Sequence, residues 1–337
     1  MKAYILEGDF GIDNLRLNDL PEPDPGPHEV VVHVKACSLN YRDLMTVKGQ
    51  YDPNLELPMT PLSDCAGEVA AVGPNVTRVR TGDRVAGAFM QGWLDGPLTR
   101  EKAGTALGGD LPGMLARHVV LHEEGLVHLP DDLEYEEAAT LPCAGVTAWN
   151  ALFGDRPIEA GQTVLTLGTG GVSSFALLFA RAAGAKVVIT SSSDDKLGRM
   201  RSLGADETIN YEKVPDWHRL VKEKTGGHGA DRIVETGGGQ TLNESIQAAG
   251  PEAEIAVIGV LTGVEAQFSI VPLLVKSIRL RGIYVGSRAM FEAMLAFMAT
   301  HDIHPLVHDT VPFEEAPEAF RMLERADHVG KIVIRMP

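Results

Sequence analysis

A glycine cluster in the middle of the chain carries the residue pattern with the clearest chemical use. The apolar, strand-like segment 163–167 is followed by Gly168, Gly170 and Gly171, and then by a helix-like run that ends near residue 185. A glycine turn between a strand and a helix lets the backbone approach a pyrophosphate, and the helix N-terminus presents free N–H groups and a positive dipole end to it. The stretch therefore predicts dinucleotide binding, with an ordinary glycine turn as the alternative.

The glycine pattern departs from G-x-G-x-x-G at its third place, where Ser173 stands. That place serves close packing of the helix on the strand, and serine is small enough for it. Val172, directly after the glycines, opens the helix and is a further candidate for cofactor contact.

The end of the next strand bears on which dinucleotide is bound. Proteins that use NAD usually place an acidic residue about 20 residues past the glycine turn, on the ribose hydroxyls. Here Ser191 stands at that place, followed by Ser192 and Lys196. Small hydroxyls and a nearby cation suit a 2′-phosphate and favour NADP(H). Asp194 and Asp195 are expected in the first turn of the following helix, where acids are favoured; a serine-rich helix cap with a solvated lysine is the alternative.

The elements around these residues change character along the chain. Roughly the first 125 residues contain short apolar strands broken by Pro and Gly, without strand–helix alternation. From residue 163 strands and helices alternate, which predicts a doubly wound parallel sheet. The final segment, 328–336, is one more strand, and it lies so far past the sheet that we expect it to return to the first domain.

Composition excludes several classes of function. The chain has 337 residues and a net charge of −16, which disfavours nucleic acid and anionic membranes as partners because both repel an acidic protein. Its three cysteines form no C-x-x-C pair, so neither a disulfide framework nor a zinc ribbon is indicated. Since neither a signal peptide nor a membrane-spanning run is evident, a cytoplasmic protein is expected.

Several segments together carry a family resemblance. They are KACSLNYRD, DCAGEVAAVG, RTGDRVAG, LPCAGVTAW, LGTGGVSSFALLFARAAGA, SLGADETINY and the C-terminal VGKIVI. Their types and order resemble the medium-chain dehydrogenase/reductase superfamily, and most closely its zinc-independent quinone oxidoreductase-like branch. The resemblance implies an α/β protein with two domains and a site in the cleft between them. A discontinuous, mostly-β GroES-like catalytic domain (1–125 and 290–337) would enclose an inserted Rossmann NADP(H)-binding domain (126–289).

The same resemblance argues against a metal. The catalytic zinc ligands of zinc-dependent members correspond here to Asn40, Ser63 and Cys143. Only one thiol is left, whereas a catalytic zinc needs three protein ligands and a water. The loop 88–113, which corresponds to the structural-zinc lobe, contains no cysteine. We therefore expect no metal site, and we expect Cys143 to pack near the nicotinamide.

Without a metal, hydrogen-bond donors must stabilise the charge that develops on the substrate oxygen. Asn40 and Tyr41, in the former metal-ligand region, are the candidate catalytic residues, with Asp43 orienting its neighbours and Tyr51 on the loop beyond. A partly buried aromatic residue with a satisfied hydroxyl is the alternative for Tyr41.

Other cofactor contacts are implied by the resemblance. Thr147 matches a threonine beside the nicotinamide, and Tyr211 an aromatic residue near the 2′-phosphate. Strand ends at the carboxyl edge of an open sheet are ligand positions, although ordinary strand termination is an alternative; the residues concerned are Gly259, Val260, Val285 and Gly286. Lys331 is a candidate for the pyrophosphate, with a surface lysine as the plainer interpretation.

The expected function is an NADPH-dependent oxidoreductase that delivers hydride to quinones or α,β-unsaturated ketones and aldehydes. One alternative is a zinc-free alcohol dehydrogenase or carbonyl reductase, which could use NAD. Another is a non-catalytic NADPH-binding sensor. The resemblance also implies a homodimer formed through the edge strand RLRGIYVG at 279–286.

Overall fold

The fold is taken from a computed structural model that describes residues 1–52 and 54–337. The chain divides into two units, a first unit of Met1–Val146 with Val285–Pro337 and a second unit of Thr147–Tyr284. The sequence-based boundaries were 125 and 290. Residues 126–146 belong to the first unit because a strand at Leu126–His128 pairs with Arg84–Gly87 and a helix at Tyr135–Ala138 packs on the same sheet.

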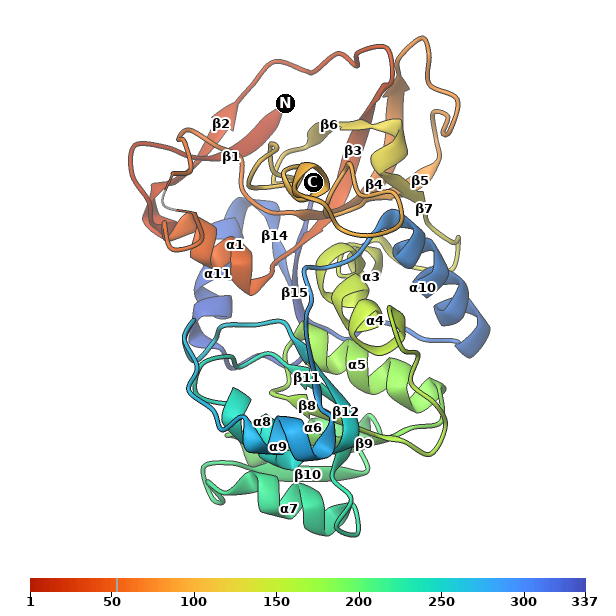
Figure 1. Cartoon of the computed structure of the whole chain (residues 1–337). Helices are drawn as coiled ribbons and strands as arrows, with labels where there is room; N and C mark the ends of the chain where they lie inside the picture. Colours follow the sequence, from red (N-terminus) through yellow and green to blue (C-terminus); the bar gives the residue numbers. More distant parts are fainter. Residues whose placement is uncertain (53) are drawn as a thin grey trace. The chain divides into compact units, whose positions relative to one another are not determined.

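The first unit is built mostly on antiparallel strands, with one parallel pair between β14 and β15 (Figure 1). A separate pair, β1 (Lys2–Leu6) and β2 (Leu15–Asp19), lies beside a larger sheet with the order β14-β15-β3-β4-β5-β7, in which β6 also pairs with β3. The strands of that sheet are β3 (Glu29–Ser38), β4 (Asp64–Val72), β5 (Arg84–Gly87), β6 (His118–His122), β7 (Leu126–His128), β14 (Val307–Pro312) and β15 (Lys331–Arg335). Because β15 pairs antiparallel with β3, the expected return of the C-terminal strand to this domain is confirmed.

Short helices close the first unit. They are α1 (Tyr41–Val47), α2 (Arg100–Ala103), α3 (Tyr135–Ala138), α10 (Arg288–His301) and α11 (Ala316–Arg325), with a π-helical turn at Leu141–Gly145 and 3₁₀ turns at Ile12–Asn14, Glu123–Gly125 and Phe313–Glu315. Helical spacing places Phe291, Met294 and Met298 of α10 in the interior. The apolar face of this helix therefore belongs to the core.

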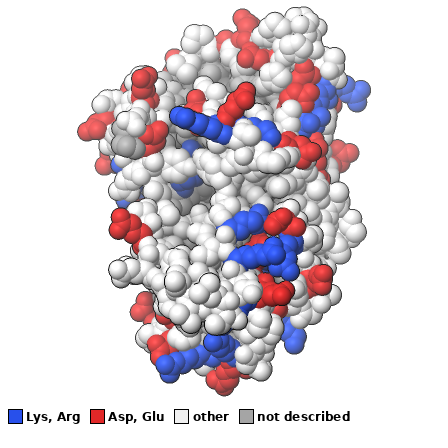
Figure 2. Space-filling model, viewed as in Figure 1, with Lys and Arg blue, Asp and Glu red and all other residues white. Residues whose placement is uncertain are grey.

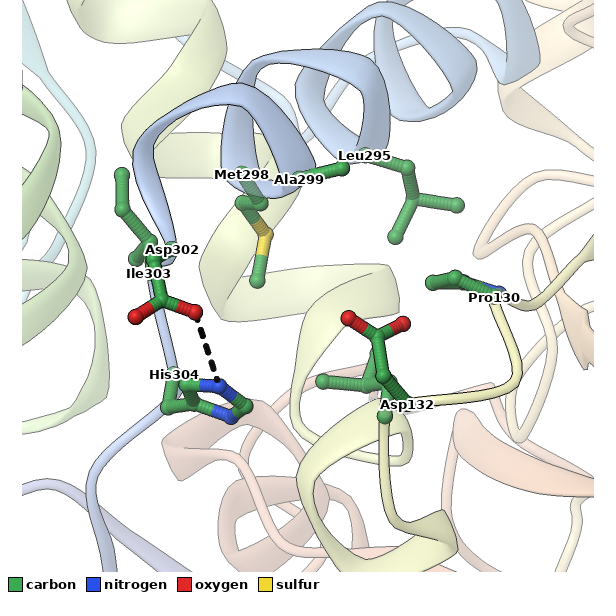
Figure 3. A pocket seen from close by; sticks show the side chains of 9 residues that line it. Pro130, Asp132, Leu295, Met298, Ala299, Asp302, Ile303 and His304 are labelled. Carbon is green, nitrogen blue, oxygen red and sulfur yellow. Dashed lines mark ion pairs between the residues drawn. The ribbon is translucent and has the colours of Figure 1, made fainter.

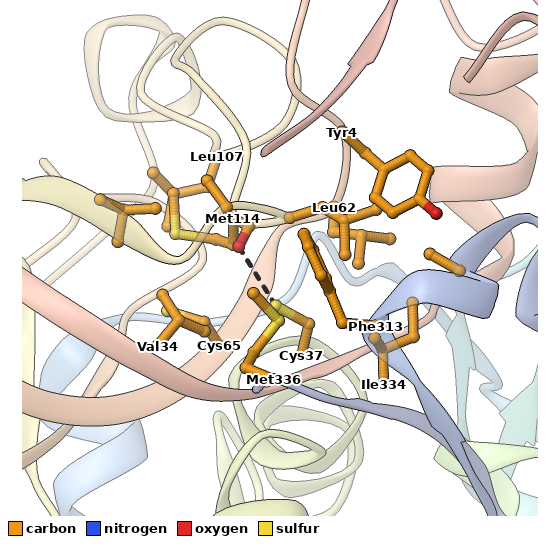
Figure 4. Packing of buried hydrophobic residues seen from close by; sticks show 14 of the residues in the cluster. Tyr4, Val34, Cys37, Leu62, Cys65, Leu107, Met114, Phe313, Ile334 and Met336 are labelled. Carbon is orange, nitrogen blue, oxygen red and sulfur yellow. Dashed lines mark hydrogen bonds between the residues drawn. The ribbon is translucent and has the colours of Figure 1, made fainter. Parts of the chain in front are cut away.

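Apolar residues from distant parts of the chain fill the interior of the first unit (Figure 4). Tyr4 packs edge-on against Phe313, with ring centroids 5.2 Å apart. The thiol of Cys37, fully buried on β3, donates to the carbonyl of Met114 at 3.1 Å. Cys37 and Cys65 are therefore packing residues of the core.

The second unit is a parallel sheet with the order β10-β9-β8-β11-β12-β13 (Figure 1). Its strands are β8 (Thr163–Leu167), β9 (Lys186–Ser191), β10 (Glu207–Asn210), β11 (Ala230–Glu235), β12 (Ala249–Val257) and β13 (Arg279–Gly282), and the helices are α4 (Val146–Phe153), α5 (Gly171–Ala182), α6 (Asp194–Ser202), α7 (Trp217–Lys224), α8 (Leu242–Ala248) and α9 (Val271–Lys276). The central strand β8 is buried along its whole length, as expected for a sheet covered on both faces. The doubly wound fold predicted from strand–helix alternation is confirmed.

Surface charge is mixed on the face shown in Figure 2, where small groups of acidic and basic side chains are separated by uncharged surface. Within residues 1–52 and 54–337, no helix combines the length and the apolarity that crossing a bilayer requires.

Candidate functional site

The glycine turn of the second unit has the backbone geometry that close approach requires. Gly168 follows β8 with φ +75°, a conformation that favours glycine, and Gly170 is the N-cap of α5. Gly171 and Val172 open the helix, whose first-turn amides have no partner within the helix. Ser173 is buried and its hydroxyl donates to the carbonyl of Leu167 at 2.7 Å. The serine thus ties α5 to β8 in the place of the third glycine.

The candidate 2′-phosphate region lies where β9 ends. Ser191 is buried there and its carbonyl accepts from the backbone N–H of Tyr211 at 3.1 Å, which brings these two residues together. Ser192 is exposed and Lys196 is half-buried on the first turns of α6.

Lys213 is a residue of this region that the sequence reasoning missed. Its ammonium pairs with Asp194, and Asn210 donates to the same carboxylate at 2.8 Å. These hydrogen bonds, that of Lys213 first, lower the pKa of Asp194. The negative charge of Asp194, which argues against a 2′-phosphate nearby, is therefore offset by Lys213, 19 residues further along the chain.

Thr147 is buried near the start of α4, a helix that buried charges anchor to the sheet. Arg281 donates to the carbonyl of Asn150 at 2.6 Å, and Arg232 donates to the carbonyl of Ala151. Glu254, on the strand between them, pairs with both guanidinium groups at 2.9 and 3.2 Å. In the sequence, the only sign of these contacts is the presence of charged residues within otherwise apolar strands, and the predictions above did not use it.

The remaining strand-end candidates differ in their surroundings. A Cβ atom on Gly259 would lie 2.0 Å from the carbonyl oxygen of Thr236, so only glycine fits there. Val260 beside it is exposed. Val285 and Gly286 belong to the first unit, and Val285 has φ 56°, which is strained for a β-branched residue. Such strain gathers at functional sites.

In the first unit, Asn40 lies at the centre of a buried hydrogen-bond network. Its side-chain carbonyl accepts from the Lys331 ammonium at 2.5 Å, and its amide nitrogen donates to the hydroxyl of Ser63 at 3.4 Å. Ser63 in turn donates to Asp64 at 2.7 Å, and the other carboxylate oxygen of Asp64 accepts from the backbone N–H of Cys143 at 3.2 Å. The three positions that correspond to zinc ligands are thus joined by hydrogen bonds.

Asp43 supports this network from α1. Its carboxylate accepts from the backbone N–H of Asn40 at 2.8 Å, closing a capping box at the start of the helix. It also pairs with Arg42 at 3.1 Å. Asp43 is fully buried, so its contacts are those of an orienting residue.

The two candidate tyrosines lie outside this buried network. Tyr41 is the first residue of α1 and is 42% exposed. Tyr51 is also exposed, with the Arg42 guanidinium over its ring at 4.7 Å from the centroid. Both interpretations of Tyr41, a substrate donor and a partly buried aromatic residue, are compatible with this exposure.

The surface interpretation of Lys331 is wrong. The residue is 4% exposed at the start of β15, and its ammonium donates to the carbonyl of Leu39 and to Asn40. Burial lowers its pKa, and the nearby Asp64 opposes that shift. A strand that returns from the C-terminus thus delivers a cation to the Asn40 network.

These residues do not fit a zinc ion. Asn40 and Ser63 supply an amide and a hydroxyl, and burial followed by the charge of Asp64 raises the pKa of the Cys143 thiol, which favours the protonated form over the thiolate that zinc binds. In the part of the chain that the structure describes, no three His, Cys, Asp or Glu side chains gather as a metal-binding group.

The first unit also contains a small recess (Figure 3). It lies between Pro130, Asp132 and the end of α10, where Asp302 and His304 form an ion pair at 3.7 Å. None of the candidate catalytic or cofactor-binding residues lines it.

Comparison with known proteins gives the family. The alcohol dehydrogenase GroES-like domain matches residues 26–131, and the zinc-binding dehydrogenase domain matches residues 171–300. A zinc-type alcohol dehydrogenase-like protein of Schizosaccharomyces pombe is 43% identical, covering 99% of both chains. A quinone oxidoreductase-like protein 2 homolog of Nematostella vectensis is 30% identical, covering 99% of this chain and 86% of its own.

Solved structures agree in fold. An NAD-dependent alcohol dehydrogenase has a TM-score of 0.91 and 35% identity, with 100% of both chains covered. A mycobacterial protein complexed with NADPH has a TM-score of 0.83 and 26% identity, with 99% of both chains covered. A GroES-like domain with a Rossmann domain defines an oxidoreductase that binds NAD(P)H. The chain belongs to the medium-chain dehydrogenase/reductase superfamily, in its zinc-independent quinone oxidoreductase-like branch.

Proposed function

We propose that this protein uses NADPH to reduce quinones or α,β-unsaturated ketones and aldehydes without a metal. The observation that carries the proposal is the buried Asn40–Ser63–Asp64 hydrogen-bond network, which includes two of the positions that the family resemblance matches to zinc ligands. The nicotinamide supplies a hydride when bound, and solvent supplies the proton that completes the reduction.

Asn40 is the proposed catalytic residue. Its side-chain nitrogen carries two N–H groups, of which Ser63 accepts one. The Asn40 side chain also hydrogen-bonds to Asp64, which opposes the rise that burial causes in the pKa of that carboxyl. We propose that a substrate oxygen takes over this second N–H as charge develops on it, because a buried donor acts there in a low dielectric. Asp43 keeps the backbone of Asn40 in place through the capping box. Exposed Tyr41 is retained as a candidate for substrate contact.

The second unit supplies the proposed cofactor contacts. The turn at Gly168, Gly170 and Gly171 with Val172 would hold the pyrophosphate, and Thr147 would contact the nicotinamide. Ser191, Ser192, Lys196 and Tyr211 would surround the 2′-phosphate. The pairing of Asp194 with Lys213 supports NADPH because it offsets an acidic charge close to Ser191 and Ser192 in the sequence. Gly259, Val260, Val285 and Gly286 remain candidates at the strand ends.

Cofactor preference and acceptor can be tested together. Oxidation of NADPH and of NADH is measured against quinones, enones and simple ketones. Faster turnover of quinones or enones with NADPH supports the proposal. Turnover of simple ketones alone favours a carbonyl reductase, greater activity with NADH contradicts the cofactor preference, and tight NADPH binding without turnover favours the sensor alternative.

Lys196→Ala tests the 2′-phosphate site directly. Loss of the cation should weaken NADPH binding roughly 10-fold or more and leave NADH binding nearly unchanged, since only NADPH carries the phosphate. Binding is measured by fluorescence titration with both cofactors. Equal losses for the two would remove Lys196 from the site. The matched control is Lys224→Ala, which removes a surface lysine paired with Glu207.

We also propose that the protein is a homodimer formed through the edge of the parallel sheet. β13 is the terminal strand of that sheet, as the sequence suggested. Large apolar side chains are exposed on α9 and around it, including Ile270, Val271, Leu274 and Val275. An edge strand beside exposed apolar residues is a surface that a second copy would cover.

A further inference from the structure

We infer that Lys331 is a positioning residue that holds Asn40 in the orientation needed to donate a hydrogen bond to the substrate. This inference rests on the proposed function, in which Asn40 is the donor. It assigns Lys331 to the reacting end of the site and not to the cofactor pyrophosphate.

The chemistry of the two side chains determines which way the Asn40 amide faces. A lysine ammonium has donors only, so the atom of Asn40 next to it must be the carbonyl oxygen. The amide nitrogen then faces the opposite way, toward Ser63. Ser63 uses its own hydrogen on Asp64 at 2.7 Å and therefore accepts from Asn40. The donors all point in one direction, from Lys331 through Asn40 and Ser63 to Asp64.

Lys331 is itself held in place. Its ammonium also donates to the backbone carbonyl of Leu39, and the residue begins β15, which pairs with β3. The side chain is enclosed, so a charge is kept beside the Asn40 carbonyl out of contact with solvent. A positive charge on the carbonyl oxygen polarises the amide and makes its N–H groups stronger donors. Lys331 thereby supplies, through Asn40, part of the positive potential that a metal supplies in zinc-dependent relatives.

Lys331→Met tests this role, since methionine has a similar length and no donor. Without the ammonium, the side-chain amide of Asn40 can flip and present its carbonyl oxygen to the substrate in place of an N–H donor. We expect kcat for the acceptor to fall roughly 100-fold, a loss comparable to that of one oriented donor, with the dissociation constant of NADPH changed less than about 2-fold. The control is Lys35→Met, on the neighbouring strand, where the lysine bonds to His33 at 3.0 Å.

A double-mutant cycle with Asn40→Ala separates positioning from general structural support. If Lys331 acts through Asn40, Lys331→Met costs little further kcat in the Asn40→Ala background. Additive losses, or a variant with unchanged kcat per folded molecule and a lower melting temperature, would overturn the inference. A raised NADPH dissociation constant with normal kcat would return Lys331 to the pyrophosphate. If the methionine variant does not fold, Lys331→Gln keeps a donor without the charge and should show a smaller loss of kcat.

A second measurement does not depend on turnover. The side-chain amide signals of Asn40, assigned by their absence in Asn40→Asp, should shift in the ¹H–¹⁵N spectrum when Lys331 is replaced. Unchanged signals would contradict the inference even in a protein without measurable activity. Wild-type protein that reduces no acceptor would contradict the proposed function alone.

Discussion

At the scale of single residues, the site is organised by buried polar groups that compensate one another. Asp64 is enclosed, and burial raises its pKa to about 6, with the charge of Lys331 opposing the shift. Its oxygens accept from Ser63 and from the backbone of Cys143. These partners stabilise the ionised form of Asp64. Its burial still lowers the free energy of unfolding, by an amount that depends on pH.

That cost can be measured with Asp64→Asn. The folded protein binds the Asp64 proton more tightly than the unfolded chain, so this group lowers stability as pH rises from about 4 to about 6. The Asp64→Asn variant lacks the titrating carboxyl group. Its stability relative to wild type should therefore rise by roughly 3 kcal/mol between pH 4 and pH 7. Urea unfolding at both pH values measures the change, and a constant difference would contradict the assignment.

At the scale of elements, charged residues of the sheet hold the helix that carries Thr147. Arg232 and Arg281 hold the carbonyls at the end of α4 against the sheet, and Glu254 compensates both charges. Arg232 and Glu254 are buried, whereas Arg281 is partly exposed, and burying a charge is tolerated only while it is paired and hydrogen-bonded. Position and stability of α4 are thus coupled through Arg232.

Arg232→Met should destabilise the protein by about 3 kcal/mol, because it removes two carbonyl contacts and one partner of Glu254. NADPH binding should weaken as Thr147 loses its support. Denaturant unfolding and cofactor titration measure the two effects. Arg219→Met is the matched control: its surface pair with Asp216 spans 3.7 Å and should contribute less than about 0.5 kcal/mol. Equal effects of the two substitutions would show that the anchor is unimportant.

At the scale of the whole molecule, two predictions concern what the chain binds. One is the second copy proposed to cover β13 and α9. The other is zinc, which the description of the matching family model names and which the amide of Asn40, the hydroxyl of Ser63 and the raised pKa of the Cys143 thiol disfavour.

Leu274→Asp combined with Val275→Asp should convert the proposed dimer to a monomer, because both side chains are more than 70% exposed on α9 and a charge would have to be buried against the partner. Sedimentation equilibrium gives the molecular mass. Leu17→Asp, which charges an exposed apolar position on β2, should leave it unchanged. A wild-type mass of one chain would refute the dimer.

Elemental analysis of the purified protein should find much less than one zinc ion per chain, and dialysis against a chelator should leave NADPH oxidation unaltered. One zinc per chain, lost together with activity, would overturn the metal-free mechanism.

Local patterns in the sequence determined the second unit well. The period of apolar residues and the glycine turn are properties of neighbouring residues, so strands, helices, the turn before α5 and the close packing of Ser173 could be inferred directly. The return of the last strand followed from counting elements. Only the tertiary structure brought Lys331 to Asn40, across 291 residues, and Lys213 to Asp194. Side-chain pairing at such separations depends on strand register and burial, and no local pattern encodes either.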